Sequence, residues 1–175
     1  GAGRTAGPDA LLRLHERHPG HYPVLLESVG GGSELGRHDL LLALPGPMLV
    51  QQADGRIDGP PQVAGHTRFL SALDACWREE RVAMRDPAAE PFVGGWFLYL
   101  GYELAAEIEP TLRLPASHLP QALAWRMRGA VVRDRLTGDV ALHAEPGFEQ
   151  QLEAQFAADM ASADGDSGAV LVPDA

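Results

Sequence analysis

The chain has 175 residues, 45% of them hydrophobic, and a formal net charge of −10, which together predict one folded domain or a large part of one. All 14 basic residues are arginines, set against 24 carboxylates, so the chain should repel polyanions and nucleic acid is not an expected partner. No apolar run approaches the roughly 20 residues that span a bilayer, so no membrane partner is expected either. The single cysteine, Cys76, excludes an internal disulfide and fits a reducing cytoplasm.

The first third of the chain is predicted to form one helix and several strands. Residues 1–8 lack the pattern of a signal peptide and are expected to be a flexible start. A possible Asp9 cap and the Pro19-Gly20 stop predict a short helix over 9–18. The segments that follow are a strand at 22–29, a mobile glycine-rich loop at 30–36, and two antiparallel strands at 37–45 and 47–52 that are separated by Pro45-Gly46-Pro47.

The middle of the chain combines the most regular helical pattern with the segment richest in aromatic residues. Phe69, Leu73 and Trp77 recur at helical spacing and predict an amphipathic helix over 67–84. The stretch 91–110 reads PFVGGWFLYLGYELAAEIEP. Its alternate positions are apolar on both sides, which predicts a strand buried on both faces that turns into a short helix.

The last third predicts a hairpin and a second amphipathic helix. Residues 122–145 alternate on either side of a Thr137-Gly138-Asp139 turn, and apolar residues then recur every fourth position from Phe148 to Met160. Residues 163–175 are small and acidic and are interpreted as a linker. The chain is therefore predicted to be an α+β domain over 9–162, with a mainly antiparallel sheet and packed helices.

Residues 91–110 also contain groups that invite a chemical role. The spacing of Gly94, Gly95 and Gly101 fits no phosphate-binding loop. These glycines are better explained by a bend or by a close approach of the backbone to another element. Glu103 and Glu107 lie one helical turn apart, where a carboxylate pair either ligates a divalent metal or forms a solvated face, and the solvated face is favoured.

Three histidines near the N-terminus are of the type that binds zinc. His15, His18 and His21 are close in sequence, but Pro19-Gly20 separates His21 from the helix. They are therefore interpreted as surface histidines, because a zinc site needs three or four convergent ligands. Cys76 lies on an apolar helical stripe and is interpreted as structural, and no serine lies in a nucleophile elbow.

Three segments resemble one known family. PVLLESV at 23–29, GRHDLLLALP at 36–45 and the stretch at 91–110 resemble the N-terminal domain of chorismate-utilising synthases, which include anthranilate synthase component I and aminodeoxychorismate synthase component I. GGWFLYLGYEL is the most specific part, and GRHDLLLALP is closer to the aminodeoxychorismate synthase pattern. The resemblance covers about residues 20 to 145 and implies the fold of the anthranilate synthase component I N-terminal domain.

The resemblance implies an enzyme that aminates chorismate to 4-amino-4-deoxychorismate for 4-aminobenzoate and folate biosynthesis. In this family the catalytic residues, including a lysine, and the Mg²⁺ belong to a C-terminal chorismate-binding domain, and a glutamine amidotransferase subunit supplies ammonia. This chain has no lysine, so alone it is expected to be inactive and to contain no cofactor. Residues 163–175 are then expected to lead to the missing domain.

The resemblance also implies part of a tryptophan-type ligand pocket. Ser28 matches the serine of the family's LLES motif, and Glu27, Leu35 and Arg37 are the other expected site residues. Leu35 stands where some tryptophan-binding members have an aromatic residue, and Arg37 is expected to pair with Glu27 or with a ligand carboxylate, or to be a solvated arginine at the start of a strand. Two alternatives remain open: anthranilate synthase component I, with tryptophan as feedback inhibitor, and a non-enzymatic module that binds an amino acid or a partner.

Overall fold

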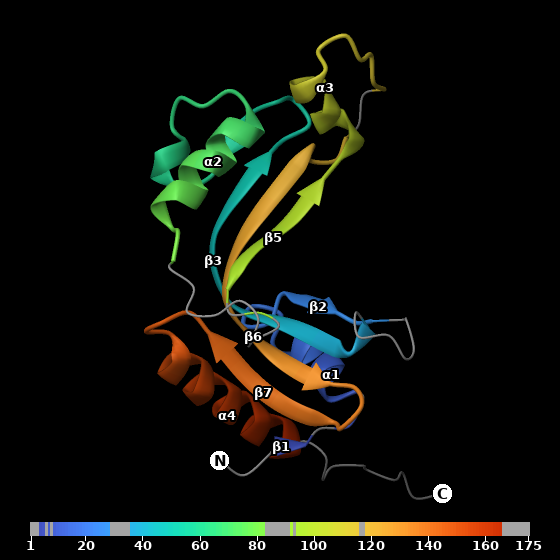
Figure 1. Ribbon diagram of the computed structural model, residues 1–175, viewed down its shortest axis with the longest axis vertical. Coiled ribbons are helices and arrows are strands. Elements are labelled where there is room, and N and C mark those ends of the chain that lie inside the picture. Colours follow the sequence, from blue (N-terminus) through green and yellow to red (C-terminus); the bar gives the residue numbers. More distant parts are fainter. Residues whose placement is uncertain are drawn as a thin grey trace, which may run out of the picture. The chain divides into compact units, whose positions relative to one another are not determined.

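The computed structural model describes residues 4–5, 7, 9–28, 36–82, 92, 94–115 and 118–165. Within these ranges the chain is an α+β protein, as predicted, with four α-helices and one sheet of seven strands (Figure 1). The helices are α1 Ala10–Arg17, α2 Phe69–Glu79, α3 Ala105–Ile108 and α4 Glu149–Gly165, with short 3-10 helices η2 Pro61–Val63 and η3 Tyr102–Leu104. The strands are β1 Arg4–Thr5, β2 Val24–Leu26, β3 His38–Gln51, β4 Ile57–Asp58, β5 Gly95–Leu100, β6 Ala122–Asp134 and β7 Asp139–Ala144.

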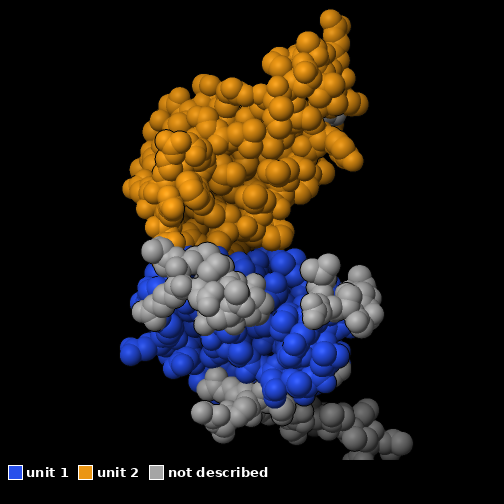
Figure 2. Space-filling model, in the orientation of Figure 1, with its two compact units in different colours: residues 1–45, 87–94, 128–175 blue, residues 46–86, 95–127 orange. Residues whose placement is uncertain are grey.

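The chain divides into two compact units (Figure 2), and the long strands β3 and β6 each supply residues to both. The first unit contains residues 1–45, 87–94 and 128–175, and the second contains residues 46–86 and 95–127. Arg135 N–H donates to Arg37 O at 2.9 Å, and Gln121 N–H donates to Gln51 O at 2.8 Å. The residue before β3 is thus bonded to the residue after β6, and the last residue of β3 is bonded to the residue before β6. The two strands are therefore antiparallel.

The prediction of two separate strands at 37–45 and 47–52 is wrong, because β3 continues through Pro45 and Pro47. On one edge β3 pairs with β2 at residues 40–42 and with β4 at residues 50–51, so the described pairings leave both prolines between these ladders. A proline that need not donate a ladder hydrogen bond is tolerated there. The preceding residue, Leu44, is buried at a φ of 53°, a left-handed conformation that interrupts the regular strand.

In the first unit, strands in the order β1-β7-β6-β3-β2 are covered by α1 and α4. Leu11 and Leu14 of α1 and Leu152 and Phe156 of α4 share one apolar core with strand residues that include Val131. The predicted helices at 9–18 and from Phe148 to Met160 are thus confirmed, as is the hairpin of β6 and β7. Helix α4 continues to Gly165, into the stretch expected to be a linker, and residues 166–175 lie outside the described ranges.

In the second unit, α2 packs its apolar side onto β3 and β6. Phe69 and Cys76 of α2 form a buried cluster with Leu49 of β3 and Ala122 and Ala124 of β6. The predicted helix at 67–84 is confirmed in its central part, and Cys76 is buried as expected. Burial raises the pKa of its thiol, and the neighbouring carboxylates of Glu80 and Glu79 raise it further. The thiol is therefore a structural group.

The prediction that the strand near residue 98 is buried on both faces is wrong. Strand β5 pairs with β6, and within the described residues its other edge has no partner strand. Leu98 and Leu100 on one face are 44% and 52% exposed and Tyr99 on the other is 44% exposed, so neither face of this end of β5 is fully covered. The glycines of this region do permit a close backbone approach, since a Cβ on Gly101 would lie 2.9 Å from the carbonyl oxygen of Gln121.

Candidate functional site

Ser28, the central residue of the predicted pocket, follows the end of β2 and has both backbone groups hydrogen-bonded. Its N–H donates to Oδ1 of Asp39 at 3.2 Å, and its carbonyl oxygen accepts a hydrogen bond from Nη1 of Arg135. Among the described residues the Ser28 hydroxyl has no hydrogen-bond partner, and its side chain is half-buried. The protein thus holds the backbone of Ser28 in place and leaves its hydroxyl as the group that can meet a ligand.

Asp39 is the charged centre of this region. Its side chain is 8% exposed, and its Oδ2 accepts from Nη1 of Arg133 at 3.2 Å. Arg135 adds a second guanidinium, with Nε 3.8 Å from Asp39 Oδ1. A buried carboxylate needs such partners, because an unpaired charge out of water is strongly unfavourable. Asp39 therefore depends on the end of β6, because Arg133 is in that strand and Arg135 directly follows it.

Arg37 is exposed and pairs with Asp134 at the end of β6, not with Glu27. Its Nε and Nη2 lie 2.7 Å and 2.6 Å from Oδ2 of Asp134. The hydrogen bond from Arg37 lowers the pKa of Asp134 from 3.8 to about 2, helped by the backbone N–H of Leu136. Glu27 is exposed, and Leu35 lies outside the described residues.

The structure therefore brings Ser28 and Arg37 to one end of β2, β3 and β6, linked through Arg135. Three guanidiniums and two carboxylates gather there, namely Arg37, Arg133, Arg135, Asp39 and Asp134. Such a set can bind the carboxylate and the ammonium of a small amino acid through opposite charges. Sequence reasoning missed Asp39, Arg133 and Arg135. The spacing of the two arginines at i and i+2 on a predicted strand was the signal that could have found them.

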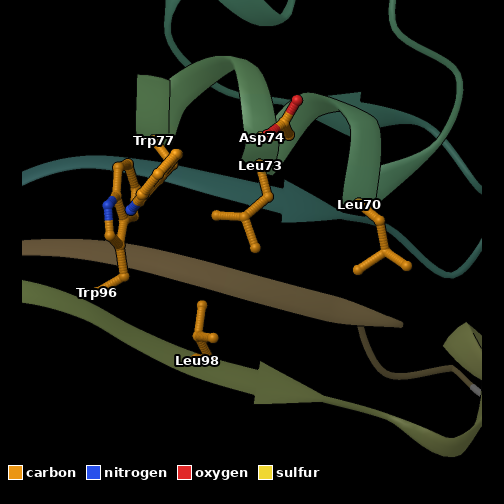
Figure 3. Close-up of a pocket in the computed structure, with 6 residues that line it drawn as sticks. All are labelled: Leu70, Leu73, Asp74, Trp77, Trp96 and Leu98. Carbon is orange, nitrogen blue, oxygen red and sulfur yellow. The ribbon is translucent and has the colours of Figure 1, made fainter. Parts of the chain in front are cut away.

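A separate apolar cavity of about 260 Å³ lies in the second unit between α2 and β5. Figure 3 shows Leu73 and Trp77 of α2 pointing toward Trp96 and Leu98 of β5. Leu70 and Asp74 complete its lining. The cavity is open to solvent, since Trp77 is 47% exposed. Its volume lies below the usual range for drug-sized ligands, so it suits a small apolar group.

Of the pair Glu103 and Glu107, Glu107 is not part of a solvated face, since its side chain is 11% exposed. Glu107 Oε1 accepts from the backbone N–H of Phe69 at 2.5 Å, and Oε2 accepts from that of Leu70 at 3.2 Å. These are first-turn amides of α2, which have no partner inside the helix. Glu107 therefore caps α2 from a neighbouring element, and the prediction of a solvated face is wrong for this residue.

His18 and His21 are partly exposed, in keeping with their interpretation as surface histidines, but they do not lie apart from one another. His18 and His21 stack with their ring centroids 5.8 Å apart, and both face Asp159 of α4. His15 turns away and bonds to the carbonyl oxygen of Tyr22 through Nδ1 at 2.7 Å. Burial raises the pKa of Tyr22, and the charge of Asp159 raises it further. Within the described residues, His18, His21 and Asp159 form one group with metal-ligand chemistry.

Comparisons with known proteins do not assign a family. No protein-family model matches the chain, and no curated protein matches it closely enough to count as a relative. None of the helices in the described ranges is both long and apolar enough to cross a membrane. The activity, the ligand and the partners of the chain are therefore matters of proposal.

Proposed function

We propose that this chain is the N-terminal, non-catalytic part of a chorismate-aminating synthase of the aminodeoxychorismate synthase component I type. In this proposal it supports a C-terminal chorismate-binding domain and supplies one wall of a pocket for an amino acid such as tryptophan. A glutamine amidotransferase subunit delivers ammonia to the whole enzyme in the cytoplasm. We also propose that the fold is that of the anthranilate synthase component I N-terminal domain, and the antiparallel α+β architecture supports this.

The observation that carries the proposal is the pairing of two of the motif segments. Strand β2 lies within PVLLESV and GRHDLLLALP opens β3, and the two strands pair with Val24 opposite Leu42 and Leu26 opposite Leu40. This register brings Ser28 next to Asp39, whose carboxylate accepts the Ser28 N–H. Two motifs that bind the same ligand must have residues that lie side by side in the folded protein, and this register meets that requirement.

The described residues do not fit the Mg²⁺ that the parent enzyme is expected to use. Mg²⁺ prefers several oxygen ligands in octahedral geometry. Glu107, the candidate carboxylate ligand, is committed to capping α2. The one group with metal-ligand chemistry in the described ranges contains two imidazoles, which suit transition metals better. The proposal therefore assigns Mg²⁺ and the amination chemistry to the C-terminal domain.

The decisive test is the product made by the full-length protein. We expect chorismate, ammonium and Mg²⁺ to yield 4-amino-4-deoxychorismate, identified by mass spectrometry and by its conversion to 4-aminobenzoate with the lyase that follows. The 175-residue chain alone is the control and should be inactive. Anthranilate as the product would move the protein to the other branch of the family, and absence of both products with a folded protein would overturn the proposal.

The pocket is tested separately with tryptophan and calorimetry on the same full-length protein. We expect Ser28→Ala to weaken tryptophan binding by about 2- to 12-fold, the worth of one hydrogen bond. Ser71→Ala is the matched control, because Ser71 belongs to the second unit and bonds to His66. Equal binding by wild type and Ser28→Ala would remove Ser28 from the site, and binding without any amination would favour a non-enzymatic module.

A further inference from the structure

We propose that His18, His21 and Asp159 bind one divalent transition-metal ion of the Zn²⁺ class. His18 ends α1, His21 lies in the following turn, and Asp159 is in α4. The Nδ1 atoms of His18 and His21 lie 3.6 Å and 2.9 Å from the two carboxylate oxygens of Asp159. One ligand atom from each of the three residues lies within 4.8 Å of the others. Ligand atoms about 2.1 Å from a tetrahedral ion lie about 3.4 Å from one another, so a small shift of the side chains would bring the three atoms onto one ion.

The hydrogen bonds of Ser162 orient His18 for metal binding. Ser162 Oγ donates to the carbonyl oxygen of Asp159 at 2.7 Å and lies 3.3 Å from Nε2 of His18. Its single proton is used by the carbonyl, so its oxygen accepts from Nε2–H. In the neutral ring, Nδ1 then presents its lone pair to the Asp159 carboxylate. A hydrogen bond to the second ring nitrogen is the usual support of a metal-bound histidine.

A cation placed between the rings and the carboxylate would satisfy all three groups. His21 Nδ1 lies within hydrogen-bond distance of Asp159 Oδ2, at 2.9 Å, whereas His18 Nδ1 is 3.6 Å from Oδ1, too far for a hydrogen bond. One divalent ion would neutralise the carboxylate and accept the lone pairs of both rings, which stack at an interplanar angle of 9°.

The burial of Asp159 favours a compensating positive charge. Its carboxylate is 8% exposed, so little water reaches it and its charge needs partners within the protein. A metal ion would supply that charge, and a water bound to the ion would complete its coordination.

The chemistry of the three ligands selects the type of metal. Two imidazole nitrogens and one carboxylate oxygen suit Zn²⁺, Co²⁺ or Ni²⁺, whereas Mg²⁺ and Ca²⁺ require oxygen ligands. A bound ion would join the turn after α1 to α4, two segments that are distant in sequence. We therefore expect the ion to stabilise the first unit by binding the folded state.

The test is titration of the metal-free full chain with Zn²⁺ by calorimetry and with Co²⁺ by visible absorption. We expect one ion per chain, a higher Tm with Zn²⁺, and a loss of affinity of at least about 100-fold in His21→Ala. Ser162→Ala should bind about 10-fold more weakly, as for other residues that hold a metal-bound histidine in place. His118→Ala is the control, because His118 is exposed and belongs to the second unit.

Two variants keep the test independent of misfolding. His21 is half-exposed, so His21→Ala should fold normally, and far-UV circular dichroism checks this. Asp159→Asn keeps the shape of the side chain and should abolish the Co²⁺ spectrum. Absence of Zn²⁺ binding by the wild-type chain, unchanged affinity in His21→Ala and Asp159→Asn, or equal loss in His118→Ala would each overturn the proposal.

Discussion

The Nε atom of Arg126 lies 3.0 Å from Oε2 of Glu80, and the arginine side chain is only 3% exposed. Its Nη1 also donates to the carbonyl oxygens of Gly95 and Met127 at 2.9 Å and 2.8 Å. Glu80 directly follows α2, Gly95 begins β5 and Met127 is in β6. One buried guanidinium therefore connects the end of the helix to both strands.

Replacement of this guanidinium should strongly destabilise the second unit. We expect Arg126→Ala to lower the free energy of unfolding by about 3 kcal/mol, because it leaves a partly buried carboxylate and two carbonyl groups without their donor. Arg78→Ala is the control, since its ion pair with Asp74 is exposed and contributes less than about 1 kcal/mol. Urea denaturation measures both variants, and similar losses in the two would contradict the assignment.

Gly94 is predicted to be intolerant of any side chain. A Cβ at this position would lie 2.4 Å from Oε1 and 2.5 Å from Cγ of Glu145, which is buried. We expect Gly94→Ala to destabilise the first unit by about 1–3 kcal/mol through overpacking. Gly20→Ala meets no atom within 4 Å, so its Tm should stay close to that of the wild type. A neutral effect of Gly94→Ala would show that Glu145 can move aside.

Glu107 is predicted to stabilise α2 although it lies outside that helix. Glu107→Ala removes the acceptor of two first-turn amides and a negative charge near the helix N-terminus, and should cost about 1–2 kcal/mol of stability. Glu109→Ala is the comparison, because its exposed carboxylate bonds to Thr111. Hydrogen exchange of the Phe69 and Leu70 amides provides a local readout. Unchanged protection of these amides in Glu107→Ala would contradict the capping role.

The pair of Arg37 and Asp134 predicts a specific acid titration. Because the pKa of Asp134 falls from 3.8 to about 2 on folding, the folded state holds its proton less tightly than the unfolded state. The stabilisation is present above about pH 4 and is lost as the pH falls through about 2. Carboxyl carbon shifts measured by NMR should give this midpoint, and Arg37→Gln should raise it toward 3.8. Arg56→Gln, which alters a pair with Asp58, should leave it unchanged.

Local pattern alone was enough to predict part of this fold. Leu11 and Leu14, and likewise Leu152 and Phe156, recur at helical spacing, and each pair occupies the buried face of its helix. The hairpin of β6 and β7 follows from alternation around a glycine turn. Such elements are predictable because their hydrogen bonds and their apolar faces arise from residues that are near in sequence.

The errors arose where distant partners decide the outcome. Pro45 and Pro47 usually indicate a turn. Strand β3 continues through them because the described strand pairings require no backbone N–H donor at these two positions. The apolar side chains of β5 suggested double burial, but exposure depends on which elements cover a strand. The role of Glu107 depends on the N-terminus of a helix that is far away in sequence.

By itself the sequence determined the α+β class, the amphipathic helices, the buried thiol of Cys76 and the motifs that suggest a family. Only the tertiary structure decided that Ser28 meets Asp39 and Arg135, and that His18 and His21 meet Asp159. The physical reason is that a secondary-structure element follows from local periodicity, whereas a site follows from side chains that folding brings together from different elements.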